Sequence, residues 1–180
     1  MRRLAHLGCA AALVALAATA APATDGGALR ALDVGDAGGT VRPLGERLGD
    51  APALVAFWAS YCLPCRAEVP ALRRAARRWA GRGVRIVGIA TDAGSAAELR
   101  RAADAWGIDY ESLWVPASAD AAVAALLPRG LPATFAIAAG HAARLDGRLD
   151  DAAIDALVGP LLRTPAAPVP PDSARRPPAP

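Results

Sequence analysis

Hydrophobic runs and turn residues divide the middle of the chain into alternating strands and helices. Residues 53–58 are apolar throughout, which is typical of a strand buried on both faces. In residues 66–79, apolar side chains recur every three or four positions and arginines occupy the opposite face, which predicts an amphipathic helix. Comparable patterns predict further strands at 84–90, 109–115, 133–138 and 142–145, and further helices at 95–106, 118–127 and 150–162. This alternation predicts an α/β sheet with helices on both faces.

The segment 29–44 predicts an N-terminal hairpin before this region. Two short strands flank the turn sequence Gly35-Asp36-Ala37-Gly38-Gly39, and Pro43 confines the second strand to an edge because proline has no N–H to donate. Ser95 and Glu98 form a capping box that starts a helix, and Gly107 is suited to end it. Asp150 or Asp151 is expected to cap the last helix.

The two ends of the chain differ from the middle. A positively charged start, an apolar stretch at 7–18 and small residues around Ala20 predict a signal peptide at 1–20, followed by a linker at 21–28. An uncleaved membrane anchor is the alternative, although the apolar stretch is shorter than the ~20 residues that a spanning helix needs. Cys9 would leave with the signal peptide. Proline and small residues dominate 164–180, which predicts a disordered tail and limits the folded domain to 29–163.

Charge adds little to this picture. All 20 basic residues are arginine, against 17 acidic residues, and the basic excess comes from the two ends of the chain. The domain itself is nearly neutral, so nothing predicts a nucleic-acid surface.

Cys62 and Cys65 lie where the strand at 53–58 passes into the following helix. Free N–H groups and the positive end of the helix dipole stabilise a thiolate there, and the second cysteine is one turn away, within reach of a mixed disulfide on the first. A zinc site would need four ligands, which the domain lacks, and a purely structural disulfide would close too short a loop to stabilise the fold much. The spacing therefore favours redox chemistry.

The residues around this pair resemble a known family. Phe57-Trp58-Ala59 precedes Cys62-Leu63-Pro64-Cys65, Pro70 lies inside the helix, and Gly130-Leu131-Pro132-Ala133-Thr134-Phe135 follows downstream. The pattern resembles the thioredoxin fold and is most similar to the periplasmic TlpA/ResA-type thiol–disulfide oxidoreductases. The resemblance covers residues 29–162. It implies a thioredoxin-like α/β fold: a central mixed sheet flanked by helices, with the N-terminal hairpin and an extra αβ insertion at 95–115 that a minimal thioredoxin lacks.

The same resemblance assigns expected roles at the site. Cys62 would be the exposed attacking thiolate and Cys65 the more buried resolving thiol, so that the two form a redox-active disulfide. Pro64 fits the first helical positions, where its missing N–H is not needed. Glu68 lies three residues beyond Cys65, on the same side of the helix, where the family has a functional glutamate. Burial would raise the pKa of Glu68 and let it take a proton from Cys65; the alternative is a solvated first-turn carboxylate.

Pro64 and four further residues are expected to contact substrate. Pro132 is predicted to be cis and to face the cysteines, which would leave the backbone of Leu131 free to pair with an extended substrate. Trp58 and Tyr61 are candidates for the substrate surface, with a core position as the alternative for Trp58. Pro70 is expected to kink the helix.

These residues predict an exported thiol–disulfide oxidoreductase that acts mainly as a reductant, with no cofactor beyond its own disulfide and no bound metal. The resemblance implies a periplasmic or membrane-tethered, monomeric protein that takes electrons from a membrane thiol transporter and reduces apocytochrome c or copper-site assembly cysteines. One alternative is a thioredoxin-fold Cu(I) metallochaperone, which usually has more widely spaced cysteines. The other is a disulfide oxidase or isomerase; a DsbA-like oxidase would carry a larger helical insert than this chain has room for.

Overall fold

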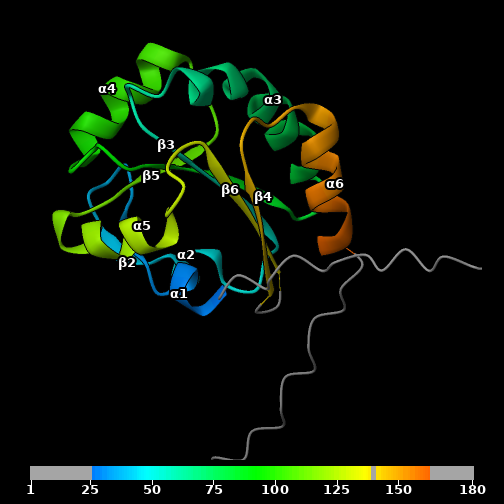
Figure 1. The fold of residues 1–180 in the computed structure, drawn as a ribbon, viewed down its shortest axis with the longest axis horizontal. Helices are drawn as coiled ribbons and strands as arrows, with labels where there is room; N and C mark the ends of the chain where they lie inside the picture. Colours follow the sequence, from blue (N-terminus) through cyan, green and yellow to red (C-terminus); the bar gives the residue numbers. More distant parts are fainter. Residues whose placement is uncertain (1–25, 139–140, 163–180) are drawn as a thin grey trace, which may run out of the picture.

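The computed structural model describes residues 26–138 and 141–162, which form one seven-stranded sheet between two layers of helices (Figure 1). The strands are β1 (Asp33–Gly35), β2 (Val41–Pro43), β3 (Ala53–Trp58), β4 (Arg85–Ala90), β5 (Glu111–Trp114), β6 (Ala133–Ala138) and β7 (His141–Asp146). The helices are α1 (Gly26–Arg30), α2 (Leu44–Leu48), α3 (Leu63–Ala80), α4 (Ala96–Trp106), α5 (Asp120–Leu126) and α6 (Asp151–Leu161), with a 3₁₀ turn at Ala117–Ala119.

The sheet is mixed, as the resemblance predicted. Its order is β2-β1-β5-β4-β3-β6-β7; β3, β4 and β5 are parallel, while β6 runs antiparallel to β3 and β7 antiparallel to β6. The insertion predicted at 95–115 is present as α4 and β5, and β5 joins the parallel strands to the antiparallel N-terminal hairpin of β1 and β2. Pro43 ends the edge strand β2, as its missing N–H predicted.

The central strand β3 is buried along its whole length because helices cover both faces of the sheet. Val55 and Phe57 point to one face and pack in the cluster that includes residues of α1, α2 and α5. Leu54 and Ala56 point to the other face and pack against α3 and α6, and Trp58 continues that face toward α4. Figure 1 shows the same division, with α3, α4 and α6 on one side of the sheet and α1, α2 and α5 on the other.

The helix ends follow the capping signals. The Ser95 hydroxyl accepts the Glu98 N–H, and the Glu98 carboxylate accepts the Gly94 N–H, so the capping box is formed, with its return bond one residue earlier than in the standard pattern. Gly107 ends α4 with a left-handed backbone, φ 64°. Asp150, rather than Asp151, caps α6 by accepting the Ala153 N–H.

At the N-terminal side, one prediction needs revision and one helix was missed. Residues 26–28 of the predicted linker belong to α1, where the buried Leu29 fastens the helix to the core. The short helix α2 was not predicted, because five residues are too few to show helical periodicity.

Several predicted segments lie outside the described residues: the signal peptide at 1–20, Cys9, the turn at 139–140 and the tail at 164–180. In the part of the chain that is described, no helix has the length and apolar character to cross a bilayer.

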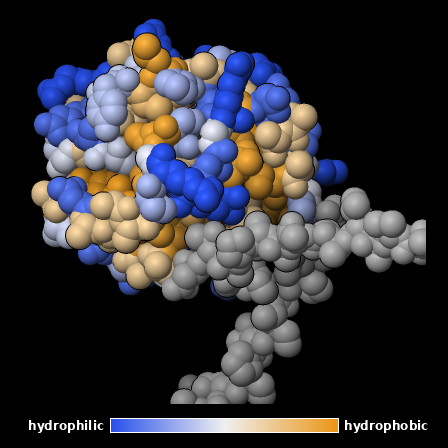
Figure 2. All heavy atoms as spheres, viewed as in Figure 1, coloured by the Kyte–Doolittle hydropathy of each residue, from blue (hydrophilic) through white to orange (hydrophobic). Residues whose placement is uncertain are grey.

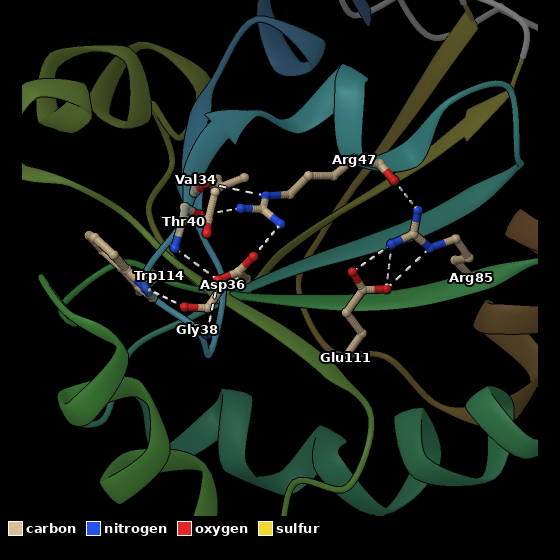
Figure 3. Close-up of polar contacts among 8 residues, drawn as sticks. All are labelled: Val34, Asp36, Gly38, Thr40, Arg47, Arg85, Glu111 and Trp114. Carbon is tan, nitrogen blue, oxygen red and sulfur yellow. Dashed lines mark hydrogen bonds and ion pairs between the residues drawn. The ribbon is translucent and has the colours of Figure 1, made fainter.

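A polar network fastens the N-terminal hairpin to the sheet (Figure 3). The Asp36 carboxylate accepts the N–H groups of Gly38 and Thr40 and pairs with Arg47, and these contacts, Thr40 first, lower the pKa of Asp36. The Trp114 indole N–H donates to the Asp36 carbonyl at 2.9 Å. Because Trp114 also packs in the cluster that contains both cysteines, the hairpin supports the site through one side chain.

The ring of Trp114 lies directly over Gly35. A Cβ on Gly35 would be 2.1 Å from Trp114 Cε2, so Gly35→Ala must displace the indole or separate β1 from β5. We expect this variant to lose about 2 kcal/mol of unfolding free energy, a usual cost of overpacking, as measured by denaturant titration. Gly81→Ala is the matched control, because a Cβ there meets nothing within 4 Å. Equal stability of the two variants would contradict the packing argument.

The surface is mixed in character. In the face shown in Figure 2, hydrophilic residues divide the hydrophobic ones into several patches. Four of the five arginines of α3, predicted as a solvated face, are partly or largely exposed but form ion pairs: Arg73 and Arg77 with Asp109, Arg74 with Asp151, and Arg78 with Asp155. Exposed pairs of this kind contribute little to stability individually, although here they connect α3 to α6 and to the segment before β5.

Candidate active site

The two cysteines form a disulfide at the start of α3. The Cys62–Cys65 bond has an S–S distance of 2.01 Å. Cys62 is the N-cap residue of α3, and its Sγ accepts the backbone N–H of Cys65 at 3.3 Å. Pro64 occupies one of the first helical positions, as predicted. A sulfur at this place receives a donor from the helix start, which is the arrangement that stabilises a thiolate after reduction.

Both sulfurs are less accessible than the sequence predicted for Cys62. In this oxidised state Cys62 is 7% exposed and Cys65 is 3% exposed. The pair packs in a cluster with Trp58, Ala90 and Trp114, which come from the ends of three neighbouring strands. The predicted order of exposure is retained, but the expectation of an exposed Cys62 is corrected, because the disulfide is packed against this apolar cluster.

An open groove of about 520 Å³ runs beside the disulfide, lined by Tyr61, Cys62, Leu63, Pro64, Gly130 and Leu131. No lining residue is charged. Tyr61 is 75% exposed and Leu63 is 72% exposed, so apolar side chains extend into solvent next to the reactive bond. Exposed side chains of this size around a concave surface are typical of a site that contacts another molecule.

The loop opposite the cysteines contains the predicted cis proline. The Leu131–Pro132 peptide bond is cis, which confirms the prediction. Within residues 26–138 and 141–162, no hydrogen bond involves the backbone N–H or carbonyl of Leu131, while the Pro132 carbonyl accepts the Gly147 N–H at 3.3 Å. Leu131 therefore presents an unpaired stretch of backbone at the groove.

Glu68 is buried beneath the site. It is 2% exposed, and its Oε1 accepts the Leu149 N–H at 2.8 Å. Burial raises the pKa of Glu68 to about 7; the Leu149 hydrogen bond and the nearby Arg148 oppose this rise without cancelling it. Burial, and then the charge of Glu68, also raise the pKa of Tyr110. The structure thus excludes the solvated first-turn carboxylate and places a group that titrates near neutral pH one turn from Cys65.

The structure also places Trp58 and Pro70. Trp58 is 4% exposed and packs against Trp106, with ring centroids 5.0 Å apart, so the structure places it in the core rather than on a substrate surface. Pro70 lies inside α3, as predicted, and α3 continues to Ala80; the expected kink stays a prediction. In the described part of the chain, no three metal-ligating side chains come together.

Two contacts at the site were not predicted. Leu149, far along the chain, supplies the N–H that Glu68 accepts. Asp92, just beyond β4, accepts the backbone N–H of Ser60 in the turn before Cys62. The sequence held one usable signal for Asp92: it follows a buried strand parallel to β3, and the carboxyl ends of parallel strands meet at the same edge.

Fold, disulfide and groove together define the class of this protein as a thioredoxin-like thiol–disulfide oxidoreductase. The chain belongs to the AhpC/TSA family, whose sequence model matches residues 25–139. This is a wider group than the TlpA/ResA type that the sequence resemblance named. A comparison with curated proteins found no significant match.

Solved structures agree on the fold. A secreted Mycobacterium tuberculosis disulfide oxidoreductase, described as homologous to E. coli DsbE, has 24% identity and a TM-score of 0.59, over 75% of this chain and 98% of that one. A thioredoxin-family thiol:disulfide interchange protein from Chlorobium tepidum has 24% identity and a TM-score of 0.61, over 80% and 99%. M. tuberculosis DsbF has 23% identity and a TM-score of 0.60, over 74% and 97%. At these identities the likeness establishes the fold.

Proposed function

We propose that this protein is an exported reductant of protein disulfides, of the TlpA/ResA type, that uses Cys62 for attack and Cys65 for resolution. The observation that carries the proposal is the Cys62–Cys65 disulfide at the start of α3, beside an uncharged open groove. The predicted signal peptide supports export. The family, the fold and the groove support exchange with a protein disulfide.

In the proposed reaction the reduced protein supplies two electrons. The Cys62 thiolate attacks one sulfur of the substrate disulfide, which forms a mixed disulfide and releases the other substrate sulfur as a thiolate. Cys65 then loses its proton and attacks Cys62 Sγ; the Cys62–Cys65 disulfide forms, and the second substrate sulfur leaves as a thiolate. The substrate is reduced to a dithiol, and the protein is oxidised to the state seen here.

Glu68 would act in the second step. Cys65 is buried, and a buried thiol releases its proton reluctantly because burial disfavours the charged form. A carboxylate three residues further along the same side of α3, with its pKa raised to about 7, is suited to accept that proton and release it later.

The groove supports an extended substrate segment with apolar residues next to its cysteine. The unpaired backbone of Leu131 offers one donor and one acceptor to such a strand, while Tyr61, Leu63 and Pro64 provide an uncharged contact surface. By resemblance, the substrates would be apocytochrome c haem-attachment cysteines, with copper-site assembly cysteines second. A membrane thiol transporter would return two electrons and two protons to the disulfide.

Insulin reduction tests the exchange reaction directly. The protein, kept reduced by a low concentration of a small dithiol, is expected to precipitate the insulin B chain well above the rate of the dithiol alone. A Cu(I) titration of the reduced protein is run in parallel. Absence of insulin reduction, combined with stoichiometric Cu(I) binding, would replace the oxidoreductase proposal by the metallochaperone alternative.

The direction of electron flow is measured separately. We expect the Cys62–Cys65 potential to lie below about −200 mV, closer to thioredoxin at about −270 mV than to the oxidant DsbA at about −120 mV. Equilibration with glutathione redox buffers, followed by alkylation, gives this value. A potential near that of DsbA would assign the protein to disulfide formation and contradict a reductant.

A further inference from the structure

The turn that carries Cys62 is attached to the neighbouring strand by one carboxylate. The Cys62 N–H donates to the Ala59 carbonyl at 2.9 Å, which closes the turn of residues 59–62. Within that turn, Asp92 Oδ2 accepts both the backbone N–H of Ser60, at 2.9 Å, and the Ser60 hydroxyl. Thr91, beside Asp92, donates its N–H to the Trp58 carbonyl at 2.8 Å. The end of β4 thus fixes the path of the chain from β3 to the first cysteine.

We propose that Asp92 is a positioning residue for disulfide exchange, which fixes the turn before Cys62 and places a negative charge on that turn through its contact with Ser60. This inference rests on the proposed function, since it concerns the same site. No other side chain in the described residues contacts the polar groups of Ser60. Replacing Asp92 therefore changes both the anchoring and the charge of this turn.

The charge of Asp92 and the start of α3 have opposite effects on the stability of the Cys62 thiolate. The Cys65 N–H and the dipole of α3 favour a thiolate at Cys62, whereas a carboxylate bound to Ser60, two residues before Cys62 in the turn, disfavours it. Close to Cys62 in the chain, Tyr61, Arg66 and Glu68 are titratable or charged. Helix α4 adds Glu98, Arg100, Arg101 and Asp104, and Arg129 precedes Leu131. None of these side chains forms a hydrogen bond or ion pair with residues 59–62 in the described part of the chain.

A less stable Cys62 thiolate would change the direction in which the cysteine pair exchanges electrons. The more the reduced form is stabilised through a low-pKa thiolate, the more oxidising a dithiol–disulfide pair becomes, as DsbA illustrates. By keeping the Cys62 thiolate less stable than the helix start alone would make it, Asp92 shifts the pair toward the reducing side. That role fits a protein that donates electrons to substrates.

Asp92→Asn is the decisive variant, because an amide oxygen can still accept both Ser60 hydrogen bonds while the charge is removed. We expect the Cys62 pKa, measured from the rate of alkylation against pH on the reduced protein, to fall by about half a unit, in keeping with one partly solvated charge. The equilibrium with glutathione is expected to shift toward the dithiol. Asp104→Asn removes an exposed carboxylate that forms no side-chain hydrogen bond or ion pair among the described residues, and it is expected to leave both the Cys62 pKa and the glutathione equilibrium unchanged.

Asp92→Ala tests the anchoring part, since it removes the charge and both acceptors. It is expected to show the same fall in pKa and about fivefold slower exchange than Asp92→Asn, corresponding to the loss of a hydrogen bond. An unchanged or raised Cys62 pKa in Asp92→Asn would overturn the proposal, and equal rates for the two variants would overturn the anchoring. Because alkylation needs no substrate, failure of the insulin assay with the unmodified protein would remove the proposed function while leaving this comparison intact.

Discussion

Replacing Cys62 with serine is expected to abolish disulfide exchange, with a loss on the order of 10³-fold or more in insulin reduction, because no other group can form the mixed disulfide. The fold is expected to survive, since the disulfide closes too short a loop to matter much for stability. Circular dichroism and thermal unfolding of the reduced forms check that point. Activity in Cys62→Ser within tenfold of the unmodified protein would contradict the assigned attacking role.

Cys65→Ser separates the two steps. Cys62 can still attack, but the mixed disulfide can no longer be resolved internally, so substrates are expected to remain covalently attached until a dithiol is added. Mass spectrometry of the adducts from cell extract then identifies the partners. The double variant Cys62→Ser/Cys65→Ser is the control, because it should retain nothing. Adducts on Cys65 in Cys62→Ser, but none on Cys62 in Cys65→Ser, would reverse the assignment.

Glu68→Gln is expected to slow resolution by about 10²-fold near pH 7, the lower end of the usual range for a positioned acid–base group. In the unmodified protein the rate should rise as Glu68 loses its proton, with a midpoint at about pH 7, and the variant should lack that rise. Stopped-flow measurement of the second step across pH 5.5–8.5 shows both effects. Glu46→Gln, at an exposed position on α2, is the matched control.

The free energy of unfolding should also depend on pH through Glu68, because its pKa differs between the folded and unfolded states. The folded-state pKa of Glu68, about 7, lies above its ordinary value of 4.5, so its contribution is most favourable below pH 4.5 and is lost as pH rises through 7. Glu68→Gln should therefore gain stability relative to the unmodified protein between pH 4 and pH 8, by about 3 kcal/mol. Parallel stability–pH curves for the two proteins would show that Glu68 has an ordinary pKa and would remove it from the mechanism.

The sequence was most informative where a signal is local. The apolar run of β3 and the pattern of β6 predicted both strands with their observed bounds, and Ser95 and Gly107 predicted both ends of α4. Cys62 and Cys65 were predicted from their spacing at the junction of a strand and a helix, and Glu68 from helical spacing together with the family resemblance; the role of Glu68 stays a prediction. Pro132 was predicted to be cis through the family resemblance, and the observed bond agrees.

By itself, then, the sequence determined the alternation of strands and helices from β3 onward, the cysteine pair and the acid one turn beyond it, because each depends on residues a few positions apart. Only the tertiary structure decided what surrounds them. It buried Trp58 and both sulfurs, brought the Leu149 N–H to Glu68 across 81 positions and the Asp92 carboxylate to Ser60 across 32. Burial and long-range contacts depend on how the sheet and helices pack together, and that packing also sets the pKa values and the anchoring on which the chemistry depends.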